Sequence, residues 1–287
     1  MVIMRIKGGL GNQLFQYAAG YSLAKRLGQE LLIDSSFYPT QALRGYKLPF
    51  LAIDYTTQVE QLPINFRIEK NKYINKLFRI LDVRKFGINN QYLLETRSEI
   101  MQDFFTINKP TIYLDGYYQS EKYFIDYREE LLAQFVPNYS FEPEYIEAKK
   151  HICETNAIAV HVRRGDFVET QGNSNPNRYV LDDGYYKKCI QYIQTHIEKP
   201  YYMWFSDDIE WVKKNFGDAK DSRFISLNTT HPDIDEMMLM TECKHIITAN
   251  STFSWWAAWM KKHDGIILCP QKRYGNIEMI PSSWIKM

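Results

Sequence analysis

Residues 1–34 read MVIMRIKGGLGNQLFQYAAGYSLAKRLGQELLID and contain a strand, a glycine turn, a helix and a second strand. Residues 2–6 are mostly apolar, and three of the five are β-branched; the glycines that follow them predict a turn. Apolar residues then recur at helical spacing over 14–24, and Gly28 predicts the end of that helix. Residues 30–34 are again apolar and predict a strand. A helix that joins two strands in this way is the unit of a parallel sheet.

The same alternation returns in the second half of the chain. Apolar segments predict strands at residues 157–162, 201–205, 223–227, 245–248 and 265–269, and helices at 209–216, at 233–243 and after Ser251. This alternation predicts an α/β fold in which helices cover both faces of a parallel sheet. Residues 40–140 are irregular and rich in tyrosine, and no elements are assigned there. We expect two α/β lobes, residues 1–145 and 146–287, with a boundary near Pro143 and a cleft between them.

Composition and charge exclude several classes of protein. The 287 residues are 45% hydrophobic and 24% charged, which is typical of a folded globular protein. The net charge is +1, from 35 basic and 34 acidic residues, whereas a dedicated nucleic-acid binder usually has a clear basic excess. The four cysteines are scattered without a CxxC pair, which favours reduced thiols in a cytoplasmic protein over a disulfide framework or a zinc site.

No signal peptide or membrane-spanning segment is expected. The chain leads directly into the glycine turn, and its most apolar run, residues 253–260, is far shorter than the ~20 residues that cross a bilayer. Residues 67–85 form a basic amphipathic stretch, which we interpret as a solvated helix face. Contact with anionic lipid is the alternative. We therefore expect a cytoplasmic protein with at most peripheral membrane contact.

Four polar clusters follow predicted strands. They lie at residues 8–13, 161–166, 206–208 and 250–254. In open parallel sheets, ligands bind beyond the carboxyl ends of the strands. The coincidence of these clusters therefore predicts a ligand site at that edge of a sheet.

The glycine turn matches part of a dinucleotide-binding fingerprint. The first two glycines are present, and so is an acidic residue at the end of the next strand, Asp34. The third glycine is replaced by Leu14, whose bulk would prevent close packing of the helix on the strand. We therefore expect Asn12 and Gln13 to point their amides into the cleft. An NAD-dependent oxidoreductase and a purely structural turn are the alternatives.

The segment HVRRGD, residues 161–166, carries two adjacent arginines at the end of a predicted strand. Neighbouring residues on a strand point to opposite faces, so Arg163 and Arg164 cannot share one task. One guanidinium can face the cleft and bind a diphosphate through its fork, while the other meets a carboxylate within the protein. The available carboxylates are those of Asp166, Asp207 and Asp208. A solvated basic strand end is the alternative.

Residues 249–256 read ANSTFSWW and begin a predicted helix. The unpaired amides and the positive end of a helix form an anion site, to which the hydroxyls of Ser251 and Thr252 add donors. Ser251 as an ordinary N-cap is the alternative, and both interpretations can hold together. The tryptophans of this helix are expected in the core or at a lobe interface rather than as sugar platforms.

Four stretches together resemble the bacterial α-1,2-fucosyltransferases, in order from residue 5 to about 260. They are GGLGNQLFQ (8–16), HVRRGD (161–166), SDD (206–208) and ANSTFSWW (249–256). The resemblance implies a GT-B fold of two Rossmann-like lobes, GDP-L-fucose (GDP-fucose) as the donor, inversion at the anomeric carbon, and no metal or other cofactor. It also implies a galactose-terminated oligosaccharide acceptor, such as an O-antigen chain, that is fucosylated at its 2-hydroxyl.

The resemblance also implies a set of donor-site residues. These are Gly11, Asn12, His161, Arg163, Asp235, Glu236, Ser251, Thr252 and Phe253. Arg163 would hold the donor β-phosphate, Asn12 would face the reacting centre, and residues 251–253 would line the diphosphate site. One of the two carboxylates would read guanine, and the histidine would touch the nucleotide or serve a structural role. The acceptor would contact the N-terminal lobe, within residues 40–140.

Departure of GDP requires positive charge at its β-phosphate. We expect Arg163 and the helix start at Ser251 to supply that charge in place of a metal. Asp207 and Asp208 would then cap a helix or pair with Arg164 rather than bind a metal.

The acceptor hydroxyl needs a base if the displacement is direct. Asp166 and Glu169 are the residues that could act as the base, and a strongly oxocarbenium-like transition state would need none. Transfer of fucose to another acceptor, as in α-1,6- or protein O-fucosylation, is an alternative within the same donor chemistry.

Overall fold

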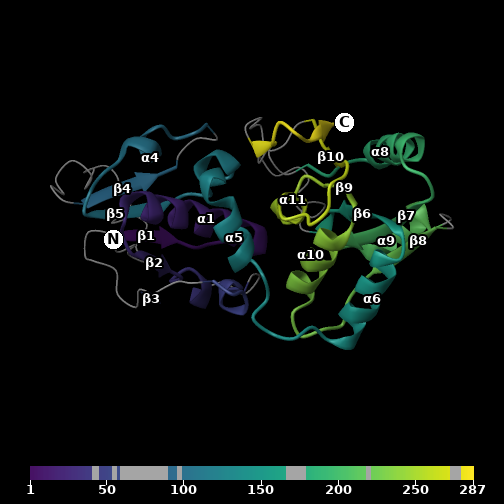
Figure 1. Ribbon diagram of the computed structural model, residues 1–287, viewed down its shortest axis with the longest axis horizontal. Helices are drawn as coiled ribbons and strands as arrows, with labels where there is room; N and C mark the ends of the chain where they lie inside the picture. Colours follow the sequence, from purple (N-terminus) through teal and green to yellow (C-terminus); the bar gives the residue numbers. More distant parts are fainter. Residues whose placement is uncertain are drawn as a thin grey trace. The chain divides into compact units, whose positions relative to one another are not determined.

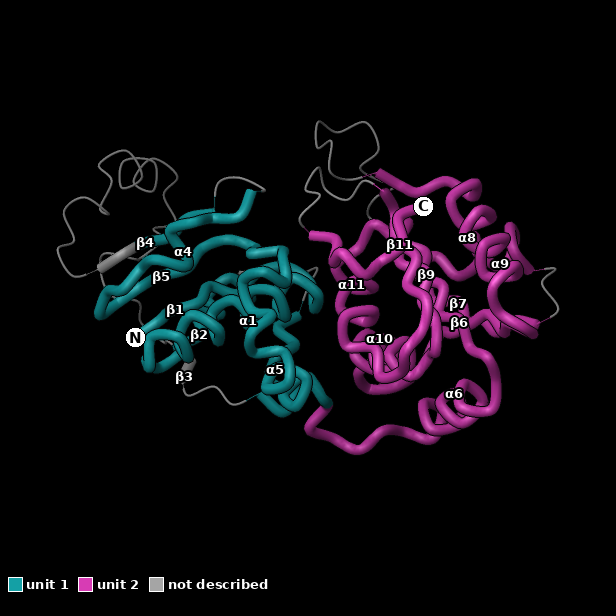
Figure 2. Tube along the Cα trace, turned by 45° about the horizontal axis from the view of Figure 1, so that its top comes forward, with its two compact units in different colours: residues 1–136 teal, residues 137–287 magenta. Residues whose placement is uncertain are grey.

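The computed structural model describes residues 1–40, 45–53, 57–58, 90–95, 99–165, 179–217, 221–271 and 279–287. The chain divides into two compact units, Met1–Val136 (unit 1) and Pro137–Met287 (unit 2), which Figure 2 colours separately. No helix among these residues combines the length and the apolar character that crossing a membrane requires.

Unit 1 is built on a five-stranded sheet of order β3-β2-β1-β5-β4, in which all neighbours are parallel (Figure 1). The strands are β1 (Val2–Arg5), β2 (Leu31–Asp34), β3 (Thr57–Gln58), β4 (Asn90–Leu94) and β5 (Thr111–Asp115). The described helices are α1 (Leu10–Leu27), α4 (Asp103–Thr106) and α5 (Arg128–Gln134), with short 3-10 turns at Tyr38–Thr40, Leu48–Phe50, Glu121–Tyr123 and Ile125–Tyr127. β1 therefore lies at the centre of the sheet.

Helix α1 is largely buried against this sheet. Gly8, at φ +84°, turns the chain from β1 toward the helix, and Gly28 ends the helix in the left-handed conformation at φ +60°. The close approach of α1 to β1 occurs at Gly20, where a Cβ would lie 2.9 Å from the Cβ of Met4. Close packing on β1 therefore does not depend on a glycine at the position of Leu14.

Unit 2 is built on a six-stranded parallel sheet of order β11-β10-β9-β6-β7-β8. The strands are β6 (Asn156–Val162), β7 (Pro200–Ser206), β8 (Ser222–Ile225), β9 (His245–Ile247), β10 (Ile267–Cys269) and β11 (Ile285–Lys286). The described helices are α6 (Pro143–Cys153), α8 (Asp183–His196), α9 (Ile209–Phe216), α10 (Pro232–Glu242) and α11 (Thr252–Trp259). Counted from β6 as the first strand of the unit, the order is that of a Rossmann-type doubly wound sheet.

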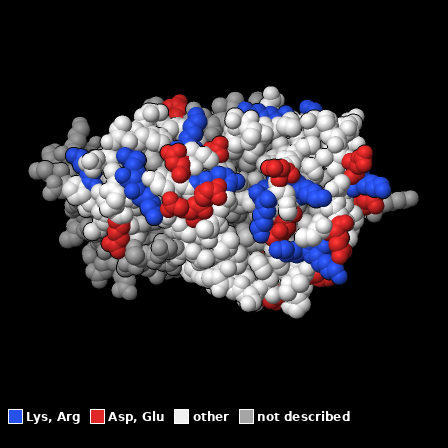
Figure 3. Space-filling model, in the orientation of Figure 1, with Lys and Arg blue, Asp and Glu red and all other residues white. Residues whose placement is uncertain are grey.

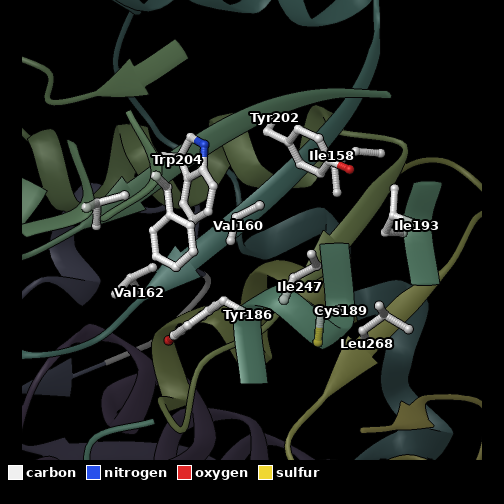
Figure 4. Packing of buried hydrophobic residues seen from close by; sticks show 12 residues of the cluster. Ile158, Val160, Val162, Tyr186, Cys189, Ile193, Tyr202, Trp204, Ile247 and Leu268 are labelled. Carbon is white, nitrogen blue, oxygen red and sulfur yellow. The ribbon is translucent and has the colours of Figure 1, made fainter. Parts of the chain in front are cut away.

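Helices cover both faces of this sheet. Ile158, Val160 and Val162 of β6 pack with Tyr186 and Cys189 of α8, and with residues of α9, in one apolar cluster (Figure 4). α6, α10 and α11 pack against one another on the other side (Figure 1). Strands buried on both faces are apolar on both, which is why the sequence shows them as nearly continuous apolar runs.

The elements expected in the second half of the chain are present, which confirms an α/β fold with parallel sheets. Boundaries differ by a residue or two: β8 ends at Ile225 rather than at 227, and β10 begins at Ile267 rather than at 265. The structure adds α6, α8 and β11, together with β4 and β5 within the tyrosine-rich segment.

The two units meet earlier in the chain than the expected boundary at residue 145. The N–H of Ala52 donates to the carbonyl oxygen of Val136 at 2.8 Å, which holds that residue in unit 1. The hydroxyl of Tyr139 donates to Asp235 at 2.7 Å, within unit 2. Pro143 is the first residue of α6, so this proline starts a helix instead of marking a linker.

Candidate functional site

The strand order of unit 2 reverses between β6 and β9, which are neighbours in the sheet. Open α/β sheets bind ligands at such a switch point, beyond the carboxyl ends of the strands. Arg163 and Arg164 follow β6, residues 206–208 complete and follow β7, and residues 248–251 connect β9 to α11. Three of the four polar clusters therefore lie at this edge of the sheet.

Each of the two arginines is paired with its own carboxylate. Nη1 of Arg163 lies 2.8 Å from Oδ2 of Asp207, and Nε of Arg164 lies 3.2 Å from Oδ2 of Asp208. The guanidinium of Arg164 also lies over Trp211 of α9, 4.0 Å from the ring centroid. From the sequence we expected only one of the two arginines to pair with a carboxylate. In the structure both do, because Asp207 and Asp208 follow β7 and each forms an ion pair with one guanidinium.

The chain at the end of β6 contacts both α9 and α11. Asp208 caps α9 as expected, accepting from the N–H of Trp211 at 3.2 Å, so Arg164 joins the end of β6 to α9. Arg163 directly follows β6, which ends at Val162. Within that strand, the ring of His161 lies 5.3 Å from that of Phe253 in α11. The end of β6 therefore contacts the start of α11 through His161.

Asp207 is fixed by a second contact and by the absence of a side chain at Gly165. Its Oδ1 accepts from the backbone N–H of Arg164 at 2.8 Å. A Cβ at residue 165 would lie 2.3 Å from Oδ2 of Asp207, closer than any side chain tolerates. The glycine that follows the two arginines thus makes room for the carboxylate that holds Arg163.

The start of α11 is built as an N-cap. Oγ of Ser251 accepts from the N–H of Phe253 at 3.2 Å, and Oγ of Ser254 accepts from the N–H of Ala249 at 3.1 Å. Ser251 is buried, whereas Thr252 and Phe253 are partly exposed. The hydroxyl of Ser251 therefore orders the turn, while the first amides of the helix can receive an anion.

The two carboxylates expected to read guanine differ in their surroundings. Asp235 is buried and accepts from the hydroxyls of Tyr139, at 2.7 Å, and Thr229, at 2.6 Å. Glu236 is partly exposed, and its Oε1 accepts from the N–H of Leu227 at 3.1 Å. Burial raises the pKa of the Glu236 carboxyl to about 7. Asp235 is thus an internal residue, and Glu236 is the better candidate for contact with a base.

In unit 1, the amides of the glycine turn point in different directions. Gln13 is fully buried: its Nε2 donates to the carbonyl oxygens of Gly8 and Gly45, at 3.0 and 2.9 Å, and its Oε1 accepts from the N–H of Lys47. The expectation that Gln13 points into a cleft is therefore wrong. Asn12 is partly exposed, and Gly11 is buried in the first turn of α1.

Asp34 is unavailable to a ribose. It is fully buried, and its two oxygens accept from the hydroxyl of Tyr113 at 2.5 Å and from the N–H of Ser36 at 3.0 Å. A dinucleotide site needs this carboxylate to bind the ribose hydroxyl. The structure therefore weighs against the oxidoreductase alternative.

A second polar cluster, which no motif of the sequence indicates, lies in unit 1 where β1 and β5 end. It comprises residues that contact one another across the tyrosine-rich segment: Arg5, Lys7, Tyr92, Glu95, Asp115, Tyr117 and Gln119. Periodicity could not reveal it, because the contacts join separate elements: Tyr92–Asp115 and Glu95–Tyr117 are 23 and 22 positions apart, and the contacts of Arg5 and Lys7 with Asp115 span 110 and 108 positions.

Two predicted groups lie outside the described residues, namely Asp166 and Glu169. Within the part of the chain that the structure describes, no three His, Cys, Asp or Glu side chains gather as a metal site would require. The four cysteines are free thiols, three of them buried.

An anion site at the switch point of a Rossmann-type sheet is the arrangement that a nucleotide-binding protein uses. Residues 1–280 match the model of glycosyl transferase family 11, and the chain belongs to that family. The expected resemblance is thereby confirmed at the level of the family.

Relatives that match this chain include two proteins of Escherichia coli. The chain is 31% identical to an α-1,2-colitosyltransferase, over 100% of this chain and 99% of that protein. It is also 31% identical to the O-antigen biosynthesis glycosyltransferase WbnK, over 98% of this chain and 99% of that protein. The galactoside 2-α-L-fucosyltransferase Sec1 of Mus musculus is 25% identical, over 93% of this chain and 66% of the mouse protein.

Proposed function

We propose that this glycosyltransferase moves L-fucose from GDP-fucose to the 2-hydroxyl of a galactose in a surface oligosaccharide, with inversion. The observation that carries the proposal is the pairing of Arg163, which directly follows β6, with Asp207, which directly follows β7, at the switch point of the sheet of unit 2. The names of the relatives, an O-antigen glycosyltransferase and a galactoside 2-α-L-fucosyltransferase, support the acceptor class. A GT-B enzyme that works in the cytoplasm on a lipid-linked acceptor is part of the proposal.

The leaving group determines what the donor site must do. As the bond to fucose breaks, negative charge grows on the β-phosphate, and fixed positive groups stabilise that charge. Arg163 would supply a guanidinium fork, and the first amides of α11 would supply the positive end of a helix. His161 and Thr252 would complete the contacts with the diphosphate.

A metal is not part of this proposal. Asp207 and Asp208 are adjacent carboxylates of the kind that holds a metal in other transferases, but each is engaged by an arginine, at 2.8 and 3.2 Å. Binding a metal there would leave two guanidinium groups without their partners. Asp207 instead aligns Arg163 for the phosphate.

The remaining residues of the proposed donor site would contact the guanine base and the fucose. Glu236 would accept from the N–H groups of guanine, and Asn12, with Gly11, would lie toward the reacting centre. Asp166 and Glu169 remain the residues proposed as the base. If neither is needed, the reaction proceeds through a dissociative, oxocarbenium-like transition state that Arg163 and α11 stabilise.

Colitose is the second candidate for the transferred sugar. It is favoured by the 31% identity to an α-1,2-colitosyltransferase over the full length of both chains. Fucose and colitose are both 6-deoxy-L-sugars, and colitose also lacks the 3-hydroxyl. The phosphate and guanine contacts proposed above would serve either donor.

A donor and acceptor screen tests the proposal. Purified protein is incubated with GDP-fucose or GDP-colitose and with lactose, Galβ1,3GalNAc or Galβ1,4GlcNAc, and the linkage of each product is determined by NMR. We expect an α-1,2-linked fucoside on galactose. A product with colitose alone would establish the second candidate, and a different linkage would overturn the acceptor assignment.

A further inference from the structure

Unit 1 has a switch point of its own, between β1 and β5. These strands are neighbours, whereas β2 and β3 lie beyond β1 and β4 lies beyond β5. Side chains that follow the ends of three strands come together there, and we refer to them as the Tyr117 cluster. Its members are Lys7 and Asn12 after β1, Glu95 after β4, and Tyr117 and Gln119 after β5. Of these, only Asn12 has a role in the donor site proposed above.

The loop after β5 is built to expose Tyr117. Oε2 of Glu95 accepts from the N–H groups of both Tyr117, at 2.6 Å, and Tyr118, at 2.9 Å. Tyr118 adopts φ +48°, which side chains rarely adopt, and its buried hydroxyl donates to the carbonyl oxygen of Leu93 at 3.0 Å. Tyr118 is buried, whereas its neighbour Tyr117 is 41% exposed. Its exposure therefore follows from a fixed backbone and is not that of a loose surface side chain.

The charges around this ring are balanced. Asp115 is almost fully buried and accepts from Nζ of Lys7, at 2.7 Å, and from Nη1 of Arg5, at 3.0 Å. Together with Glu95, two carboxylates thus face two basic side chains. A phosphate or another anion would find no net positive charge here, so the cluster suits a neutral ligand.

The groups beside Tyr117 match the chemistry of a sugar. Nζ of Lys7 lies over one face of the Tyr117 ring, 5.0 Å from its centroid, and Nε2 of Gln119 donates to Oδ1 of Asn12 at 2.9 Å. A pyranose packs its C–H face on an aromatic ring and directs its hydroxyls to amides and carboxylates at the rim. Asn12, Gln119 and Glu95 provide such groups.

We propose that the Tyr117 cluster binds a neutral terminal hexopyranose of the acceptor, with Tyr117 as the platform and the amides and Glu95 as hydrogen-bonding partners of its hydroxyls. This inference rests on the proposed function and names the acceptor site of the same reaction. What it adds to the expected acceptor side of the N-terminal lobe is the particular side chains, namely Tyr117 with Asn12, Gln119 and Glu95.

Steady-state kinetics on the full-length enzyme tests this inference. With saturating GDP-fucose and varied lactose, Tyr117→Ala should raise the acceptor KM by about tenfold, the effect of losing a stacked ring. The KM for GDP-fucose should stay within about twofold of the wild-type value, and Tyr117→Phe should retain most of the acceptor affinity. Phe105→Ala is the matched control, because Phe105 lies in α4 of the same unit and is 37% exposed, similar to Tyr117.

Saturation-transfer NMR with methyl β-galactoside, in the presence of GDP, measures binding without turnover. We expect a signal with the wild-type protein that Tyr117→Ala loses and Phe105→Ala keeps. An unchanged acceptor KM and signal in Tyr117→Ala would overturn the inference while transfer by the wild type still supported the proposed function. A rise in the KM for GDP-fucose alone would also overturn it. If the wild type bound galactoside but transferred no sugar, the site would stand and the proposed reaction would fail.

Discussion

Two adjacent arginines have different partners in this molecule. Arg164 is held against α9 by Trp211 and Asp208. Arg163 is held by Asp207, which follows β7. The side chains of these neighbours are similarly buried, 19% and 18% exposed, so exposure alone could not tell them apart.

Alanine substitutions of the two arginines should therefore have different effects, one on turnover and the other on stability. Arg163→Ala should lower kcat by about 10²–10³-fold with an unchanged melting temperature, because it removes a contact to the charge of the leaving group. Arg164→Ala should lower the free energy of unfolding by about 1–2 kcal/mol, since it removes a ring-stacked cation and leaves Asp208 without its partner. Turnover assays and thermal denaturation of both variants measure this. The reverse pattern would mean that Arg164 serves the phosphate.

Glu236 provides a prediction on pH. Burial raises the pKa of its carboxyl to about 7, whereas the unfolded chain has the ordinary value near 4.5. The ionised form is the one that accepts from guanine, so GDP affinity should be lost as the pH falls below 7 and should level off above it. Titration calorimetry between pH 6 and pH 8 should show a change of about tenfold in Kd.

The variant Glu236→Gln should remove this pH dependence and bind GDP more weakly at pH 8. Glu210→Gln is the matched control, because the side chain of Glu210 in α9 is 79% exposed. A GDP affinity that did not change with pH in the wild type would argue against Glu236 as the guanine contact.

At the scale of elements, glycines determine where helix α1 begins and ends and how closely it packs on β1, and each does so in a different way. Gly8 and Gly28 supply left-handed backbone, but Gly20 supplies space, since its missing side chain lets the helix approach Met4 of β1. The sequence shows the turn and the end of this helix clearly. It does not show the close approach, which depends on the residue that faces Gly20 from another element.

Gly20→Ala should lower the free energy of unfolding by about 1–3 kcal/mol, because the added methyl would lie 2.9 Å from Met4 Cβ and 3.0 Å from Leu31 Cδ1. Gly45→Ala is the control, since the nearest atom to its new methyl would be Cε of Lys47 at 3.6 Å, an ordinary contact. Its effect should remain within about 0.5 kcal/mol. Equal effects in chemical denaturation would show that α1 can move away from β1.

Helices and strands could be predicted from the sequence better than the side-chain contacts between them. The strands of unit 2 were readable because helices cover both faces and make each strand apolar throughout. The expected direction was wrong for Gln13, since neighbouring residues on a helix point about 100° apart and Gln13 cannot face outward together with Asn12. Glu95 and Tyr117 could not be found, because their contact joins two strand ends across a segment without periodicity.

Over the whole molecule, charge is nearly cancelled. The chain carries 35 basic and 34 acidic residues, and on the face shown in Figure 3 they are interspersed. A diphosphate therefore has to be attracted by local groups rather than by a general field. In the proposed donor site those groups are Arg163 and the start of α11.

GDP should accordingly bind with the same affinity in the presence of a metal chelator. Titration calorimetry with EDTA, followed by Mn²⁺, checks this for the whole protein. Binding that vanished in EDTA and returned with Mn²⁺ would show that Asp207 and Asp208 hold a metal in spite of their arginine partners.

The contact between Gly165 and Asp207 links two positions that are 42 residues apart in the sequence. A side chain at 165 would lie 2.3 Å from the Asp207 carboxylate, which cannot withdraw without releasing Arg163. A larger residue at 165 would therefore displace the carboxylate that holds Arg163. In evolutionary terms, position 165 depends on position 207: descendants of this gene that keep the Arg163–Asp207 pair should also keep glycine at 165.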